Sequence, residues 1–383
     1  MNSGFITSDI YKHRISLEKC LIDVFLCTFL FLPAFFNLLL LLVIVFLDFL
    51  KNRRIIIHIN STEILLFIYV WGCFFSSLYS KNVYLAFKEA ITWLVFIIVI
   101  EIFIHNNVFE KVNYLSFMIG VLIMNIIFVI GKFFYSNLLD IIPTVNCFAV
   151  IDLIYVICIE NIIQNMQAAP REIYRFLQFF LIIGIILSAS RGIFALLVLY
   201  GVYCYIYKNR KKNPNNHEKT IIGVLLILFA YLAFNFMPIY LHNYVNELMT
   251  IFSGKVFSNK IRIVLYQKSI EYGLHHGLLL GAGAGNFSVV YPLFGIKGFV
   301  AVHSHNIILQ PFIELGLIGF VVTIAMVMTL IFKAIKAKKN NDELYIEILI
   351  PFIIYGMVDY LWGDIRVGIM LFIFVGQMLK KVV

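Results

Sequence analysis

Charge is scarce in this sequence. Only 13% of the 383 residues are charged, whereas 62% are hydrophobic, and the mean hydropathy is +0.95. So little charge excludes an ordinary soluble domain, in which about a quarter of the residues are charged. The apolar residues form continuous runs of helical length, without the alternation of an outer-membrane strand. We therefore expect an all-α integral membrane protein.

Motifs of several other functional classes are missing. The six cysteines lie in or beside apolar runs with no CxxC pair, which argues against a disulfide or zinc framework. The glycine-rich stretch 281–285 follows no strand pattern and precedes no GK[ST], so it is not a nucleotide-binding loop. There is no dense carboxylate cluster of the kind that Mg²⁺ uses, and we expect neither a metal nor another cofactor. The first apolar run lacks a small-x-small cleavage site, so we expect it to remain as a membrane span.

The apolar runs predict about twelve transmembrane helices. The first run, 21–50, is too long for one span and contains Pro33, so we divide it into two short spans that meet in a hairpin. The other ten predicted spans are 62–79, 86–105, 114–135, 138–159, 174–189, 192–207, 220–238, 306–332, 343–358 and 365–380.

The placement of lysine and arginine predicts the orientation of these helices. One side of the predicted membrane holds twenty of the 30 cations, and five of the remaining ten lie in a single long loop. The more positive side should be cytoplasmic, with both termini inside, so the net charge of +9 reflects topology rather than nucleic-acid binding. We expect transmembrane helices one to nine in 1–238, a periplasmic loop with short helices in 239–305, and helices ten to twelve in 306–383.

Two histidines mark the end of the predicted loop, in the sequence Val302-His303-Ser304-His305-Asn306. A histidine exchanges protons near neutral pH, so this pair at a membrane boundary is a candidate acid/base centre. The alternative is a pair of interfacial histidines without a chemical task. Nine residues separate Asn306 from Gly316, and Gly316 and Gly319 should lie on one helix face and let a neighbouring helix approach closely.

Two arginines are candidates for binding phosphate. Arg191 stands at the abrupt junction between two apolar helices, where a guanidinium can pair bidentately with phosphate oxygens or simply anchor the helix end. Arg262 follows Lys260 and opens an amphipathic helix predicted over Ile261–Leu274; its alternative is a solvated loop charge. Glu314 should lie about two and a half turns inside the tenth helix, where a carboxylate needs a partner or a proton.

The order of these motifs resembles the O-antigen ligase family. The matching pieces are Ser190-Arg191-Gly192, Arg262 before the glycine-rich stretch, His305-Asn306-x9-Gly-x-x-Gly, and Asp359 near the last helix. Members of this family are polytopic membrane glycosyltransferases of a GT-C-like fold, and they share a superfamily with many O-antigen and capsule polymerases.

The resemblance implies an inverting, metal-independent transfer at the periplasmic face of the bacterial inner membrane. His305 is expected to deprotonate the acceptor hydroxyl while Arg191 and Arg262 act on the diphosphate of the donor. Asp359 either orients a catalytic histidine or arginine or pairs locally with Arg366. The residues expected to bind substrate are His303, Asn306, Asp359, Arg366 and Lys260.

The implied reaction moves a polysaccharide from undecaprenyl diphosphate to lipid A–core in lipopolysaccharide biosynthesis. A repeat-unit polymerase with the same lipid-linked donor is the close alternative, and this sequence does not separate the two. A transporter of lipid-linked saccharide is less favoured, because it predicts charged residues through the middle of the bundle and internally repeated halves.

Overall fold

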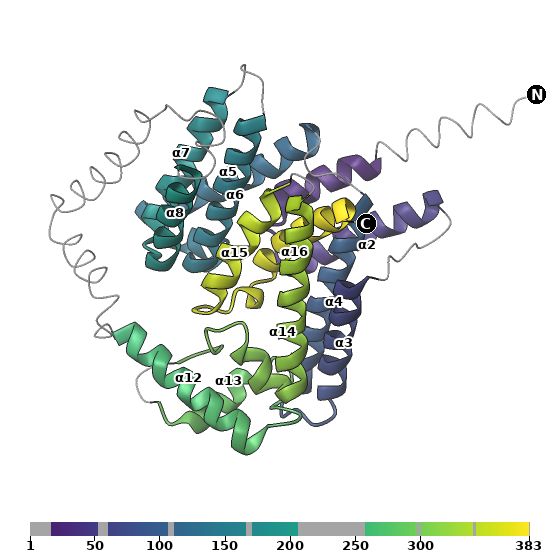
Figure 1. Cartoon of the computed structure of the whole chain (residues 1–383), viewed down its shortest axis with the longest axis vertical. Helices are drawn as coiled ribbons and strands as arrows, with labels where there is room; N and C mark the ends of the chain where they lie inside the picture. The colour runs from purple at the N-terminus through teal and green to yellow at the C-terminus, as the bar shows by residue number, and fades with distance from the viewer. Residues whose placement is uncertain are drawn as a thin grey trace, which may run out of the picture.

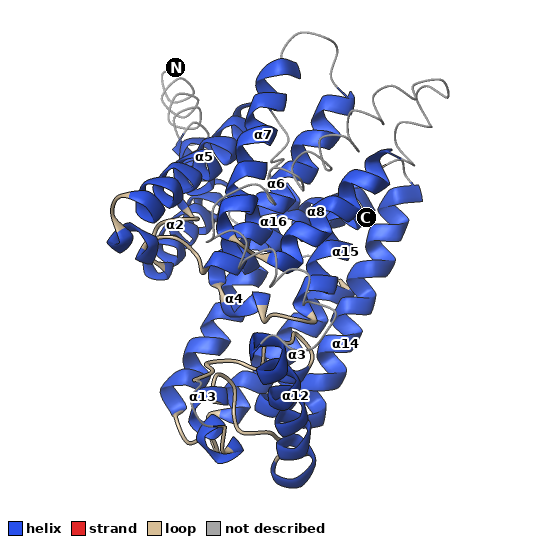
Figure 2. Cartoon of the chain, turned by 90° about the vertical axis from the view of Figure 1, so that its left-hand side faces the viewer, coloured by secondary structure: helices blue, strands red, loops and turns tan. Residues whose placement is uncertain are grey.

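The chain folds into a bundle of helices with a smaller helical layer at one end (Figures 1 and 2). All regular secondary structure in the described residues is helical, which confirms the all-α class. The predicted span 220–238 and residues 239–256 and 297–299 of the predicted periplasmic loop lie outside the residues that the structure describes. The computed structural model describes residues 17–52, 60–105, 111–165, 171–205, 257–296, 300–339 and 342–382.

The helices α2 to α8 and α14 to α16 form the bundle, and α12 and α13 form the layer at its end (Figure 1). The bounds of the helices are α2 (Ala34–Asn52), α3 (Ser61–Ser76), α4 (Val83–His105), α5 (Lys111–Phe133), η1 (Ser136–Asp140), α6 (Val145–Asn165), α7 (Arg171–Ser188), α8 (Arg191–Tyr203), α12 (Phe257–His276), α13 (Phe287–Val290), η4 (Tyr291–Phe294), α14 (Leu309–Lys339), α15 (Leu344–Gly356), η5 (Leu361–Gly363) and α16 (Ile365–Val382).

The length and composition of these helices indicate a membrane protein. Four helices in the described ranges are long and apolar enough to cross a bilayer, and four shorter ones are also apolar. The predicted count of twelve spans and the predicted orientation stay predictions. The four long candidates are Val83–His105, Leu115–Phe133, Val145–Gln164 and Leu309–Lys339.

Proline sets two helix boundaries. The run 21–50 is interrupted as predicted, because residues 29–33 form a turn that ends at Pro33 and α2 starts directly after it. The predicted start of the span 138–159 is wrong. Residues 136–140 form the short helix η1, and α6 begins only at Val145, after Pro143. Proline lacks an N–H and disfavours a helical conformation in the residue before it, which explains the later start.

Helix α14 differs most from its predicted form. The expected span 306–332 begins at Leu309, continues to Lys339 and is kinked at Gly316, whose φ is 65° and ψ −149°. The interpretation of Gly316 as a packing surface on a regular helix is therefore wrong. The kink leaves the carbonyls of Ile313 and Glu314 free to accept the N–H groups of Ala282 and Gly283, each at 2.8 Å. The glycine-rich loop thus docks onto the break in α14.

A substitution of Gly316→Ala should destabilise the fold strongly. A Cβ at this position would lie 2.5 Å from the carbonyl carbon of Leu279, and the positive φ adds strain of about 1–3 kcal/mol. We expect a clearly lower midpoint of thermal unfolding in detergent. Gly201→Ala is the matched control, since its Cβ would meet no atom within 4 Å and alanine favours a helix. Equal stability of Gly316→Ala and wild type would contradict the docked loop.

The last helix holds the turn between α15 and α16 in place. Helix α16 packs along α4, where the rings of Phe96 and Phe372 stack at 4.9 Å between centroids. Trp362, in η5, meets Trp93 of α4 edge-on at 5.4 Å. These buried rings fix the segment that carries Asp359.

Candidate active site

The loop before α14 has a conformation that few residues adopt. His305 has a φ of 54°, in the left-handed region that only a few per cent of residues other than glycine adopt. Its neighbour Asn306 caps α14, because its Oδ1 accepts the N–H groups of Ile308 at 2.9 Å and Leu309 at 3.0 Å. The Nδ2 of Asn306 donates to the carbonyl of Met357 at 2.9 Å, which ties the loop to the end of α15. The His305 ring is thereby held at the mouth of the helix.

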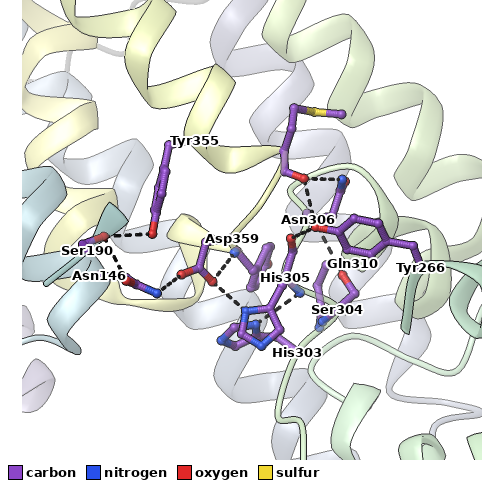
Figure 3. Close-up of polar contacts among 12 residues, drawn as sticks. Asn146, Ser190, Tyr266, His303, Ser304, His305, Asn306, Gln310, Tyr355 and Asp359 are labelled. Atoms are coloured by element: carbon purple, nitrogen blue, oxygen red, sulfur yellow. Dashed lines mark hydrogen bonds and ion pairs between the residues drawn. The ribbon is translucent and has the colours of Figure 1, made fainter. Parts of the chain in front are cut away.

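The side chain of His305 pairs with Asp359 (Figure 3). His305 Nδ1 lies 2.9 Å from Asp359 Oδ1, and the side chains are 20% and 8% exposed, respectively. Asp359 is fixed in turn by the N–H of Tyr360, at 2.9 Å from Oδ1, and by Nδ2 of Asn146, at 2.8 Å from Oδ2. The carboxylate therefore orients the ring through Nδ1, and Nε2 has no hydrogen-bond partner among the described residues.

Further hydrogen bonds connect Asp359 to the start of α8. Asn146, at the first turn of α6, accepts at Oδ1 from the hydroxyl of Ser190 at 3.1 Å. The Ser190 and Tyr355 hydroxyls lie 3.3 Å apart (Figure 3). Ser190 is the N-cap residue of α8 and directly precedes Arg191, the first residue of that helix. The polar network that begins at His305 thus ends beside Arg191.

Helix α12 lies against the same loop. The hydroxyl of Tyr266 is 2.9 Å from the carbonyl oxygen of His305 and 3.1 Å from that of Met357, and it donates to one of them at a time. Arg262 precedes Tyr266 by one turn of α12. The charge of Arg262 also acts on His303, which places the guanidinium near the histidine loop. Arg262, the histidine loop and Asp359 therefore converge although they belong to three separate segments of the chain.

Burial and neighbouring charge act together on two of these groups. Burial, then the charge of His305, lower the pKa of His303 to about 4, with Arg262 adding to the effect and Asp359 opposing it. Burial alone would raise the pKa of Asp359, but the hydrogen bond from His305 and the charges of both histidines outweigh it and lower that pKa. At neutral pH we expect a neutral His303 and an ionised Asp359.

The lowered pKa of His303 predicts a loss of stability in mild acid. An unfolded histidine has a pKa of about 6.5, so between pH 6.5 and 4 the unfolded chain binds a proton that folded His303 does not. The free energy of unfolding should therefore keep its full value above this window, as far as His303 is concerned. It should fall by up to about 1.4 kcal/mol per pH unit as the pH decreases through the window. Unfolding curves of His303→Gln should be flatter in this window, whereas His275→Gln, at an exposed position of α12, should match wild type. A wild-type slope in His303→Gln would contradict the burial of a neutral ring.

Three of the site groups have a spacing that suits a metal ion. His303, His305 and Asp359 each offer a ligand atom, and these atoms lie within 4.8 Å of one another. Both oxygens of Asp359 already accept hydrogen bonds, however, and a bound ion would have to replace the contact with His305. The predicted absence of a metal stays a prediction, which transfer in the presence of a chelator would test.

The other predicted residues are placed as follows. Arg366 pairs with Asp364 through two hydrogen bonds of 2.8 and 2.9 Å and donates to the carbonyl of Ile141 at 3.0 Å. The alternative pairing of Asp359 with Arg366 is therefore wrong. Lys260 lies in the first turn of α12, and its side chain is outside the described part of the structure.

Sequence reasoning did not assign a role at the site to four polar residues: Asn146, Ser190 and Tyr355 of this network, and Gln310, which accepts the N–H of Ser304 in the histidine loop. Ser190 stands in the quoted arginine motif, and Asn146 lies three residues after Pro143 at the start of an apolar run, a position typical of a helix terminus. Tyr355 and Gln310 lie inside apolar runs without a distinguishing pattern. No sequence signal marks Tyr355 or Gln310 as part of a site.

Comparison with known proteins identifies one domain. A family model described as O-antigen ligase matches residues 176–324, from α7 into α14, and so includes Arg191, Arg262, His303 and His305. A search of curated proteins found no match. Asp359 and Asn146 lie outside the matched segment and join the site through the fold. The match confirms the resemblance that the histidine, arginine and glycine motifs indicate: over residues 176–324 this chain is similar to the O-antigen ligase family.

Proposed function

We propose that this protein is a glycan ligase that transfers a polysaccharide from undecaprenyl diphosphate to lipid A–core at the periplasmic face of the inner membrane. The family domain supports an activity of the O-antigen ligase or polymerase type, and hence a lipid-linked glycan as substrate. The observation that carries the proposal is the hydrogen bond between Asp359 and Nδ1 of His305, at the junction of the bundle with α12.

The proposed chemical step begins with proton transfer to His305. Because Asp359 holds the proton on Nδ1, the lone pair of Nε2 is available to accept the proton of the acceptor hydroxyl. The hydroxyl oxygen then bonds to the anomeric carbon, the bond from that carbon to the diphosphate oxygen breaks, and the diphosphate leaves with the electron pair. Direct displacement of this kind inverts the configuration at the anomeric carbon.

Arginine would stabilise the departing diphosphate. Guanidinium groups form bidentate hydrogen bonds with phosphate oxygens, and in a site with little water they stabilise developing negative charge strongly. Arg262 is close enough to act on His303, and Arg191 starts α8 beside Ser190. The N-terminal end of α8 adds its own preference for an anion. We assign the diphosphate to Arg191 and Arg262.

The remaining predicted residues are proposed to shape the site around the substrates. A neutral His303 can donate or accept a hydrogen bond to a sugar hydroxyl without adding a charge. Asn306 positions the loop rather than the substrate, because both ends of its amide are used within the protein. Lys260 can add attraction for phosphate, and Arg366 can meet substrate only beside its contacts with Asp364.

A transfer assay tests this proposal. Purified protein in detergent, supplied with an undecaprenyl-diphosphate-linked glycan and lipid A–core, should form the joined product, with or without a chelator. Formation of product where no sealed compartment exists would also show that transport is not the sole activity. No product with this acceptor, under conditions in which the protein is folded, would overturn the ligase proposal.

A deletion strain separates ligase from polymerase. Loss of a ligase should leave long glycan on its lipid carrier and core without glycan. Loss of a polymerase should leave core that carries a single repeat. The second pattern would favour polymerisation, with another lipid-linked repeat as the acceptor.

A further inference from the structure

Gln310 and Glu314 form a buried polar pair that the proposed chemical step does not use. Both lie in the first turns of α14, before the kink, and each is only 2% exposed. Burying a carboxylate and an amide in an apolar bundle costs free energy unless their polar atoms are satisfied. Their partners therefore indicate what the pair does.

The amide of Gln310 is used at both ends. Its Oε1 accepts the N–H of Ser304, the residue before His305, at 2.6 Å. Its Nε2 donates to Oε1 of Glu314 at 2.8 Å. Figure 3 shows Gln310 beside the histidine loop, below Asn306 and Tyr266. The side chain thus connects the backbone of the histidine loop to a carboxylate one turn further along α14.

Glu314 holds the other end of this connection. Its Oε1 also accepts the N–H of Phe287 at 3.3 Å, and a backbone hydrogen bond from Gly285 reaches the same carboxylate. Between these two residues, Asn286 exchanges hydrogen bonds with the backbone of Asn82, at 2.9 and 3.1 Å. The carboxylate thereby holds the last residues of the glycine-rich loop.

The glycine-rich loop follows directly after α12, the helix that carries Arg262. The loop is also paired with α14 through backbone hydrogen bonds from Ala282 and Gly283. One continuous set of contacts therefore runs from Ser304, through Gln310 and Glu314, to the loop that ends α12. These contacts relate the position of His305, the proposed base, to that of α12, the helix that carries Arg262.

We infer that Gln310 and Glu314 are positioning residues that fix the position of His305 relative to Arg262. This inference rests on the proposed glycosyl transfer. Because both side chains are buried, we expect the pair to act through the two loops rather than on a substrate. It keeps the histidine loop and the glycine-rich loop in register, so that the base and the guanidinium face one reacting centre. Misplacement of reacting groups by about 1 Å can cost 10²-fold in rate, so a small disturbance here has a large consequence.

Isosteric substitutions test this inference. Gln310→Glu keeps the acceptor for Ser304 but replaces the hydrogen bond to Glu314 with two carboxylates at 2.8 Å, and we expect kcat to fall by about 10²-fold with little change in KM. Glu314→Gln keeps an acceptor for the loop N–H groups and should retain most of the turnover. The double variant Gln310→Glu with Glu314→Gln restores an amide–carboxylate pair in reversed order, and we expect it to recover at least about tenfold over Gln310→Glu.

Gln377→Glu is the matched control, since it places a carboxylate at another buried glutamine, in α16, remote from the histidine loop. It should lower thermal stability without the selective loss of kcat. A wild-type turnover for Gln310→Glu, a double variant as slow as Gln310→Glu, or an equal loss of kcat in Gln377→Glu would overturn the inference. If wild type itself forms no product, the proposed function fails instead, so the two failures are distinguishable.

Discussion

Replacement of His305 by alanine is expected to lower the turnover of glycan transfer by about 10²–10⁴-fold, the usual contribution of a positioned general base. The reason is that Nε2 is the nitrogen left for the acceptor hydroxyl once Nδ1 is bound to Asp359. The effect should fall on kcat, because Arg191 and Arg262, to which we assign the donor diphosphate, remain. Single-turnover rates with purified protein in detergent would measure it directly.

The control for this variant is His275→Ala, which removes an exposed histidine of α12 and should leave transfer unchanged. Both proteins should elute as wild type on size-exclusion chromatography, since the alanine variant keeps the hydrogen bonds by which Asn306 ties this loop to α14 and to Met357. A fully active His305→Ala protein would remove this residue from the mechanism and leave the family domain without an identified base.

Asp359→Asn should have an effect of similar size although it changes only one polar group. An amide at this position can donate to Nδ1 of His305, which would favour the tautomer with the proton on Nε2 and block proton acceptance there. The same exchange in serine proteases lowers turnover about 10⁴-fold, so we expect a loss on the order of 10²–10⁴ here. The initial rate of product formation across pH, in parallel with wild type, is the measurement.

Asp364→Asn is a matched control in the same turn. Asp364 pairs with Arg366 and has no contact with the histidine loop among the described residues, so its loss should affect stability more than turnover. Equal losses of turnover in Asp359→Asn and Asp364→Asn would mean that both carboxylates affect turnover only by stabilising the fold. Asp359 would then no longer count as the partner that orients the base.

Some features of the fold follow directly from local sequence. The apolar runs predict helices, Pro33 predicts the break before α2, and the amphipathic stretch from Ile261 predicts most of α12. Each depends on interactions between residues close in the chain, so a one-dimensional pattern contains the needed information. The later start of α6 is local as well, because Pro143 precedes it, although the predicted span did not take this proline into account. The kink at Gly316 was less accessible, because it depends on how a distant loop packs against the helix.

The candidate site shows the same division. His305, Arg191, Arg262 and Asp359 were recognisable by residue type and order, but their partners were not. Asp359 is 54 positions from His305 and 213 from Asn146. The partners of Glu314 were not predicted. Gln310 is its neighbour on the helix, but the N–H of Phe287 comes from another segment.

The sequence by itself determined the helical membrane character of the described residues and the similarity of residues 176–324 to O-antigen ligases, because hydropathy, charge placement and motif order are properties of the chain as written. The tertiary structure decided which nitrogen of His305 is bound, which carboxylate binds it, and how the glycine-rich loop reaches α14. These contacts join turns at the ends of different helices. Which turns meet is set by the packing of whole helices, and no local pattern of residues records it.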